Sequence, residues 1–163
     1  MNDRTRHRLL RAGQAFALAA ALAATTSRTE AGGPYNFFSL SPCRVVDTRQ
    51  AAAATGAPSL AANATRSFPI LGACGVPTGA QAVVFNVTVV APTDVGDLRI
   101  FPAGTTMPLA SVINWTTADF AVANGAIIPV QSSAGSDVTV RVDMPSGSKG
   151  KVDLVLDVTG YFE

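Results

Sequence analysis

The sequence predicts a single antiparallel β-sandwich of about seven to nine strands with one disulfide. Short apolar runs rich in β-branched residues recur along the chain, and Gly, Pro, Asn and Asp separate them. Two runs near the C-terminus alternate apolar and polar residues, as a strand with one buried face does. A mature chain of about 130 residues is long enough to bury one core.

The first 31 residues have the organisation of a secretory signal peptide. Four arginines and a histidine precede an apolar run over residues 15–24, and small residues follow it. A membrane-spanning helix needs roughly 20 apolar residues, so this run is too short to span a bilayer, whereas its flanks fit an export signal. Cleavage after Ala31 would release a chain that starts at Gly32, and cleavage after Ala23 is the earlier alternative. We therefore expect a secreted protein, extracellular or at the cell surface, without membrane insertion after cleavage.

Removal of this segment leaves a slightly acidic chain without histidine. Of the 12 basic and 11 acidic residues, five and two lie in residues 1–31, which leaves seven basic and nine acidic residues. That balance offers no basic patch for nucleic acid or for an anionic membrane surface. His7 is the only histidine of the chain, so the mature part has no Ser-His-Asp triad and no histidine metal ligand. We expect no catalytic residue, no metal, no cofactor and no enzyme.

Cys43 and Cys74 are the only cysteines, and an even count in an exported chain predicts a disulfide. The bridge closes a loop of about 30 residues and would stabilise the fold by roughly 3–4 kcal/mol. The alternative is a reactive Cys43 beside Arg44, which would lack a histidine to activate its thiolate.

The residues after Cys43 predict the start of the sandwich. Residues 45–46 are predicted as a short strand, and a fixed pair between Asp47 and Arg49 is the simplest account of the charges that end it. Residues 50–64 are rich in alanine with Gly, Pro and Asn, and we expect a surface loop that the disulfide holds down. Residues 32–41 are predicted as an N-terminal extension and residues 42–163 as the sandwich domain.

The middle of the chain predicts several short strands between turns. The clearest is AVVFNVTVV, residues 82–90, which is β-branched, aromatic and free of Gly and Pro. Asn124-Gly125 lies between two apolar runs, which is a strong signal for a hairpin turn. The other predicted strands cover residues 66–71, 97–101 and 111–114.

The last two strands alternate most clearly. Residues 138–144 direct valines and Met144 to one face, and residues 152–158 do the same with Val and Leu. We predict that these two strands form a hairpin in which Asp143 faces Lys151. The same register places Arg141 opposite Asp153, so that two pairs of opposite charges face each other.

Three segments stand out along residues 42–162: PCRVVDTR, CGVPTGAQAVVFNVTVV and DLVLDVTGYF. Together they resemble a bacterial secreted β-domain that occurs alone or in tandem in exported proteins. It implies a non-catalytic module of the cell surface or matrix and supplies no catalytic residue. On this resemblance the matching positions are structural: Cys43, Asp47, Arg49, Cys74, Asp157, Gly160 and Tyr161.

Two function classes follow. The first is a structural or assembly module whose partners are itself or other surface proteins, because apolar residues make up 48% of the chain and charged residues 14%. Residues 35–40 would complete a neighbour's sheet as a loose edge strand, or would pack on their own domain.

The second class is a carbohydrate- or ligand-binding module. An exposed Trp115 would stack on a sugar ring, with Asn114, Asp119 and Phe120 beside it, whereas a buried Trp115 would belong to the core. Aspartates at positions 94 and 97, and at 143, 153 and 157, offer oxygen ligands for calcium. Their spacing resembles no calcium-binding loop, so no metal is predicted.

Overall fold

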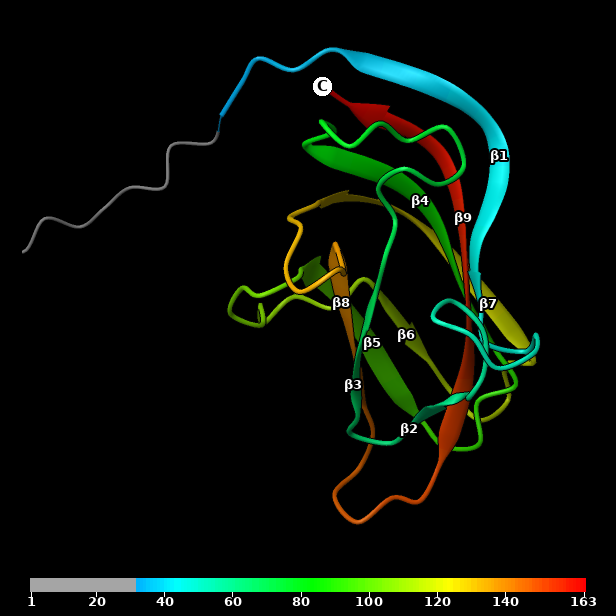
Figure 1. Cartoon of the computed structure of the whole chain (residues 1–163). Coiled ribbons are helices and arrows are strands. Elements are labelled where there is room, and N and C mark those ends of the chain that lie inside the picture. The colour runs from blue at the N-terminus through cyan, green and yellow to red at the C-terminus, as the bar shows by residue number, and fades with distance from the viewer. Residues whose placement is uncertain (1–31) are drawn as a thin grey trace, which may run out of the picture. The chain divides into compact units, whose positions relative to one another are not determined.

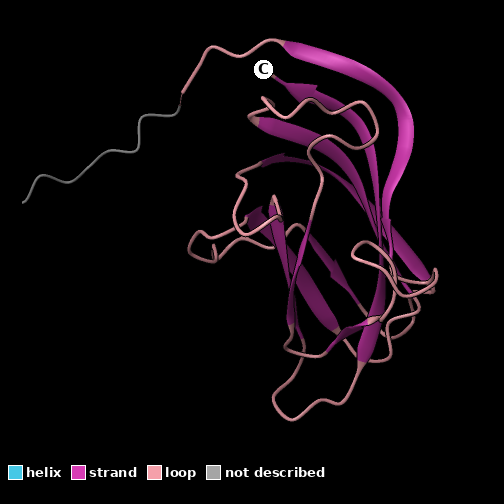
Figure 2. Cartoon of the chain, viewed as in Figure 1, coloured by secondary structure: helices cyan, strands magenta, loops and turns pink. Residues whose placement is uncertain are grey.

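The structure, a computed structural model, describes residues 32–163, and all regular secondary structure in that range is β-strand (Figures 1 and 2). Two antiparallel sheets face each other, which confirms the predicted sandwich and its strand number. The predicted signal peptide lies outside the described residues. No helix in the described range is long and apolar enough to cross a membrane. The strands are β1 (Phe37–Asp47), β2 (Leu60–Ala61), β3 (Thr65–Phe68), β4 (Ala82–Val90), β5 (Gly96–Pro102), β6 (Ile113–Trp115), β7 (Ala121–Pro129), β8 (Val138–Asp143) and β9 (Lys151–Phe162).

The larger sheet has the order β1-β9-β4-β7, with β2 also paired to β9, and the smaller sheet has the order β3-β8-β5-β6. Figure 1 shows the long strands of the first sheet curving along one side of the molecule and the shorter strands forming the second layer. The first and last strands are neighbours in this arrangement. The segments FNVTVV and LDVTGY share an apolar residue followed by Asn or Asp, Val and Thr, and they lie on β4 and β9, the two central strands, where Asn86 faces Asp157.

The core lies between the two sheets and follows the predicted alternation. The inward side chains of β4, β8 and β9 are almost completely buried, because these strands lie inside their sheets and each has one face against the opposite layer. They are Val83, Phe85, Val87, Val89, Val138, Val140, Val142, Val152, Leu154, Leu156 and Val158.

The predicted hairpin between the last two strands is wrong. β8 pairs with β3 and β5, whereas β9 pairs with β1, β2 and β4, so the two strands belong to different sheets. Arg141 faces Thr65 and Arg99, and Lys151 faces Ala61. Alternation shows which face of a strand is buried, but it does not identify the neighbouring strand. Residues 144–150 carry the chain from one sheet to the other.

The predicted turn at Asn124-Gly125 is also wrong, because β7 runs straight through both residues. Asn124 faces Val87 and Gly125 faces Asn86 in an unbroken register with β4. β7 is an edge strand, so only one of its sides has to pair. A Cβ atom added at Gly125 would meet nothing within 4 Å, so packing does not require glycine at this position.

The N-terminal extension also differs from the prediction, since β1 begins at Phe37. Phe37 faces Phe162, and Phe38 faces Tyr161 with its ring stacked on the tyrosine at a centroid distance of 5.1 Å. Of the two alternatives for residues 35–40, packing on their own domain is therefore the one observed. The predicted loop over residues 50–64 is mostly loop, but its short strand β2 pairs with β9 and buries Leu60.

Candidate functional site

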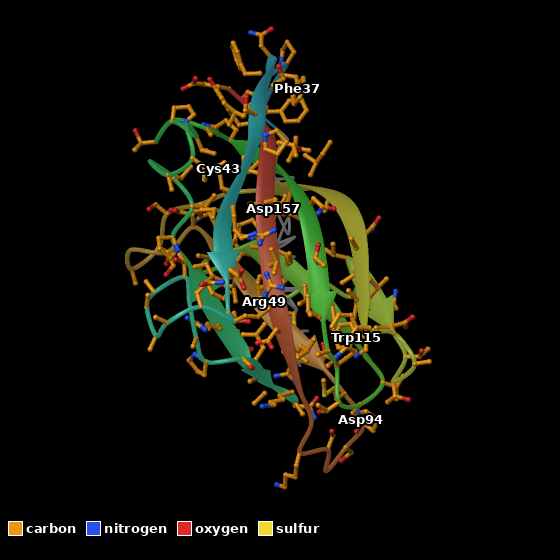
Figure 3. The ribbon with its side chains drawn as sticks, turned by 90° about the vertical axis from the view of Figure 1, so that its right-hand side faces the viewer. Phe37, Cys43, Arg49, Asp94, Trp115 and Asp157 are labelled. Atoms are coloured by element: carbon orange, nitrogen blue, oxygen red, sulfur yellow. A yellow bond between two sulfur atoms is a disulfide. The ribbon has the colours of Figure 1, made fainter. Side chains whose placement is uncertain are left out.

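The predicted disulfide between Cys43 and Cys74 is present, with the two Cα atoms 5.7 Å apart. Cys43 lies on β1 (Figure 3), and Cys74 lies in the loop between β3 and β4. The bridge therefore fastens this second loop rather than residues 50–64. Arg66 holds that first loop instead, because its guanidinium donates to the carbonyl oxygens of Pro58, Ala53 and Ala54 at 2.8–3.1 Å.

Arg44 lies one residue after the disulfide and directly opposite Asp157 of β9. Its Nε and Nη2 donate to the two carboxylate oxygens of Asp157 at 2.8 and 3.2 Å. The hydrogen bond to Asp157 raises the pKa of Arg44, and the nearby carboxylates add to this effect. The pair joins the first strand to the last across the outer face of the larger sheet.

Asp47 is buried at the end of β1 and accepts a two-point hydrogen bond from Arg49, which confirms the predicted pair. The Nε and Nη2 atoms of Arg49 each lie 2.7 Å from a carboxylate oxygen, and the backbone N–H of Arg49 lies 3.1 Å away. Gln50 donates a further hydrogen bond at 3.2 Å. The Arg49 side chain is the largest cause that holds the pKa of Asp47 well below its usual range, although burial opposes the shift. Asp47 is thus an ionised carboxylate that organises the turn after β1.

Thr48 adds a further link between the turn after β1 and strand β9, and it was not among the predicted structural positions. Its Oγ1 donates to Asp153 at 3.0 Å and accepts from the backbone N–H of Leu154 at 2.9 Å. Both partners lie on β9. The segment Cys-Arg-Val-Val-Asp-Thr-Arg therefore fastens β1 and the turn after it to the last strand and to the disulfide.

Two further motif positions lie at the far end of β9. Gly160 lies between Ser39 of β1 and Val84 of β4, and a Cβ atom there would lie 2.8 Å from the Phe38 carbonyl oxygen. Only glycine permits this close approach, while Tyr161 stacks on Phe38. Both positions have a structural explanation.

A cavity of about 410 Å³ lies beside the Arg44–Asp47 segment, under the loop after β1. Its charged groups already bind each other, since Arg44 pairs with Asp157 and Asp47 with Arg49. No aromatic ring lines it; the lining residues are Arg44, Val45, Val46, Asp47, Gln50, Ala51, Ala53, Thr55 and Gly56.

The four predicted ligand-binding residues do not form one surface. Trp115 is only 3% exposed, and its Nε1 donates to the carbonyl oxygen of Asp94 at 2.8 Å (Figure 3), so it belongs to the core. Asp119 accepts two hydrogen bonds from Thr116 in a local turn. Asn114 and Phe120 are exposed, but without the tryptophan face they offer no platform for a sugar ring.

The aspartates considered for calcium are divided between the sheets. Asp143 faces Asp97 in the smaller sheet and binds Arg99 and Arg141, whereas Asp153 and Asp157 lie on β9 in the larger sheet. Within residues 32–163, no three His, Cys, Asp or Glu side chains gather closely enough to hold a metal ion.

Asp137 is a buried carboxylate that the sequence did not single out. Its Oδ2 accepts from the backbone N–H groups of Ile70 and Leu71 at 2.7 and 2.8 Å, so it satisfies two amides of the chain that leaves β3. A lone aspartate before a strand carries no signal for this contact, because its partners are 66 and 67 residues away in the sequence.

The free edge of the larger sheet is a further feature that could bind a partner. Figure 3 shows β7 at the border of this sheet, and in the described part of the chain only β4 pairs with it. Two hydrogen bonds at the ends of the β4–β7 pair show which residues of β7 bond to β4. The Ala91 N–H donates to the carbonyl oxygen of Phe120, and the Val130 N–H donates to that of Gln81. Antiparallel strands alternate bonded and non-bonded positions, so even-numbered residues of β7 direct their backbone groups to β4.

The odd-numbered residues of β7 therefore direct their N–H and C=O groups away from the sheet. They are Ala121, Ala123, Gly125 and Ile127, followed by the carbonyl of Pro129. All of them are exposed, Ile127 at 60%, and residues 120–130 contain no charged side chain.

The sequence matches no protein-family model and no curated protein.

Proposed function

We propose that this chain is a secreted, non-catalytic structural module of the bacterial cell surface or extracellular matrix that works by assembling with other protein. The single observation that carries the proposal is the β7 edge. It is nine residues long, unbroken in register and uncharged, and only one of its sides is paired.

The other sheet edges have features that block strand addition. β1 has register shifts between Ser39 and Cys43 and between Arg44 and Val46. The edges of the smaller sheet are short, since β3 has four residues and β6 has three. Bulges, short length and charge are the usual means by which proteins protect an edge strand. Residues 121–128 of β7 have none of them, and its one protective residue is Pro129 at the C-terminal end, so most of this edge is suited to accept a strand from a partner.

Two observations support export. The first 31 residues have the order of charge, apolar run and small residues that signal peptides share. The Cys43–Cys74 bridge is compatible with an oxidising compartment outside the cytoplasm.

The test is expression of the full chain in a bacterium, followed by purification from outside the inner membrane. Intact mass reports the cleavage, which we expect after Ala31. Light scattering over a dilution series reports assembly, and we expect the mean mass to rise with concentration. A mass equal to the monomer throughout would contradict the assembly function, and an uncleaved chain retained in the cytoplasm would contradict the export.

A carbohydrate-binding module is the second candidate, and exposed aromatic rings away from Trp115 favour it. Tyr35, Phe37 and Phe38 are each more than 40% exposed at the end of the β1–β9 ladder. Aromatic faces of this kind stack on sugar rings. Glycan-array binding that Phe38→Ala abolishes and Phe120→Ala leaves intact would support this function, and an array without signal would contradict it.

A further inference from the structure

We infer that the strand added to β7 is β7 of a second copy of this chain, antiparallel and related by a twofold axis at Asn124. The inference rests on the proposed assembly function and names its partner.

The open backbone groups of β7 complement themselves. Four residues carry both an open N–H and an open C=O, and they lie symmetrically about Asn124 in the sequence: Ala121, Ala123, Gly125 and Ile127. An antiparallel copy centred on Asn124 sets Ala123 opposite Gly125 and Ala121 opposite Ile127 of the second copy. Every open donor among the four then meets an open acceptor. The missing N–H of Pro129 falls outside this pairing.

The side chains permit the same approach. Ala121, Ala123 and Gly125 are small, and the exposed Ile127 would lie beside Ala121 of the second copy and become covered. No like charges face each other, because residues 120–130 are uncharged and the carboxylate of Asp119 is bound to Thr116. Two such edges therefore meet without an electrostatic penalty.

β1 of a second copy is the other strand that might occupy this edge. Its two register shifts divide it into short segments, so it cannot present an unbroken row of donors to the nine residues of β7. Pairing of β7 with β1 would also leave one edge open at each end and build a filament, whereas β7 with β7 closes after two copies. Because β7 is regular along its whole length and β1 is not, we expect the closed β7–β7 dimer.

The first test compares Gly125→Pro with Gly125→Ala. Both side chains enter open space, since nothing lies within 4 Å of a Cβ atom at this position. Proline removes an N–H that β4 does not use, and its ring occupies the place of the partner backbone. Loss of two hydrogen bonds per dimer, at about 1 kcal/mol each, should weaken dimerisation by about 30-fold, while Gly125→Ala should dimerise like the parent. Equal dimerisation of both variants would overturn the inference.

The second test places a cysteine on the proposed axis. In a non-hydrogen-bonded antiparallel pair the Cα atoms lie about 4.5 Å apart, which a disulfide can span, so Asn124→Cys should form a covalent dimer under mild oxidation. Leu109→Cys is the matched control, because Leu109 is 94% exposed and lies outside β7, in the loop between β5 and β6. It should stay monomeric on a non-reducing gel.

The outcomes separate the two proposals. If the parent chain assembles but Asn124→Cys cross-links no better than Leu109→Cys, the β7–β7 pairing is wrong and the assembly function stands. If the parent chain remains monomeric at every concentration, both are wrong.

Discussion

Arg44 of the first strand and Asp157 of the last strand face each other and share two hydrogen bonds, at 2.8 and 3.2 Å. The side chain of Arg44 is 51% exposed, so water screens the pair. Exposed ion pairs contribute less than about 1 kcal/mol even in good geometry. We predict a coupling energy in that range from a double-mutant cycle of Arg44→Gln and Asp157→Asn, measured by urea unfolding. A coupling several times larger would show that this pair holds the two strands together.

Asp47 should matter more, because it is only 5% exposed and accepts hydrogen bonds from Arg49 and Gln50. Asp47→Asn weakens the charged bonds and should lower the free energy of unfolding by about 2–3 kcal/mol. Asp157→Asn is the matched control and should lose less. Equal losses would contradict the central role of Asp47 in the turn.

The Asp47 carboxylate should also make the free energy of unfolding depend on pH. The pKa of Asp47 is lowered by folding, so its contribution is complete above the unfolded-state pKa of about 3.9 and is lost as the pH falls towards the lower folded-state pKa. The parent chain should therefore lose stability more steeply than Asp47→Asn below about pH 5. Parallel curves of urea midpoint against pH would contradict this assignment.

Asp137 offers a test inside the fold. Asp137→Ala leaves the N–H groups of Ile70 and Leu71 without their acceptor, and each buried unsatisfied donor costs about 1–3 kcal/mol. We predict a loss of about 2–6 kcal/mol in the free energy of unfolding on that basis. Asp94→Ala is the control, since its carboxylate binds Ser148 and the adjacent Val95 in a surface turn. A smaller loss for Asp137→Ala than for Asp94→Ala would contradict the account.

The sequence predicted the features that depend on local pattern. Period-2 alternation identified the buried faces of β8 and β9, and the cysteine count identified the bridge. The Asp47–Arg49 pair was also predicted, because its partners lie two residues apart.

Features that depend on distant partners could not be read in this way. The hairpin of β8 and β9 was wrong because the two strands belong to different sheets. The roles of Thr48 and Asp137 depend on residues 106 and 67 positions away. Asn124-Gly125 favours a turn locally, but a full ladder with β4 keeps it extended. A buried Trp115 was one of the two alternatives that the sequence left open, and the packing of β6 in its sheet decides for it.

Residue-resolved amide hydrogen exchange over a dilution series tests the β7 edge most directly. In dilute protein, Val122, Asn124 and Ala126 should be protected by β4, while Ala121, Ala123, Gly125 and Ile127 exchange freely. At high concentration the second group should become protected as well. If the exchange rates of the Ala123 and Gly125 amides do not change with protein concentration, no strand pairs with this edge and the proposed assembly is wrong.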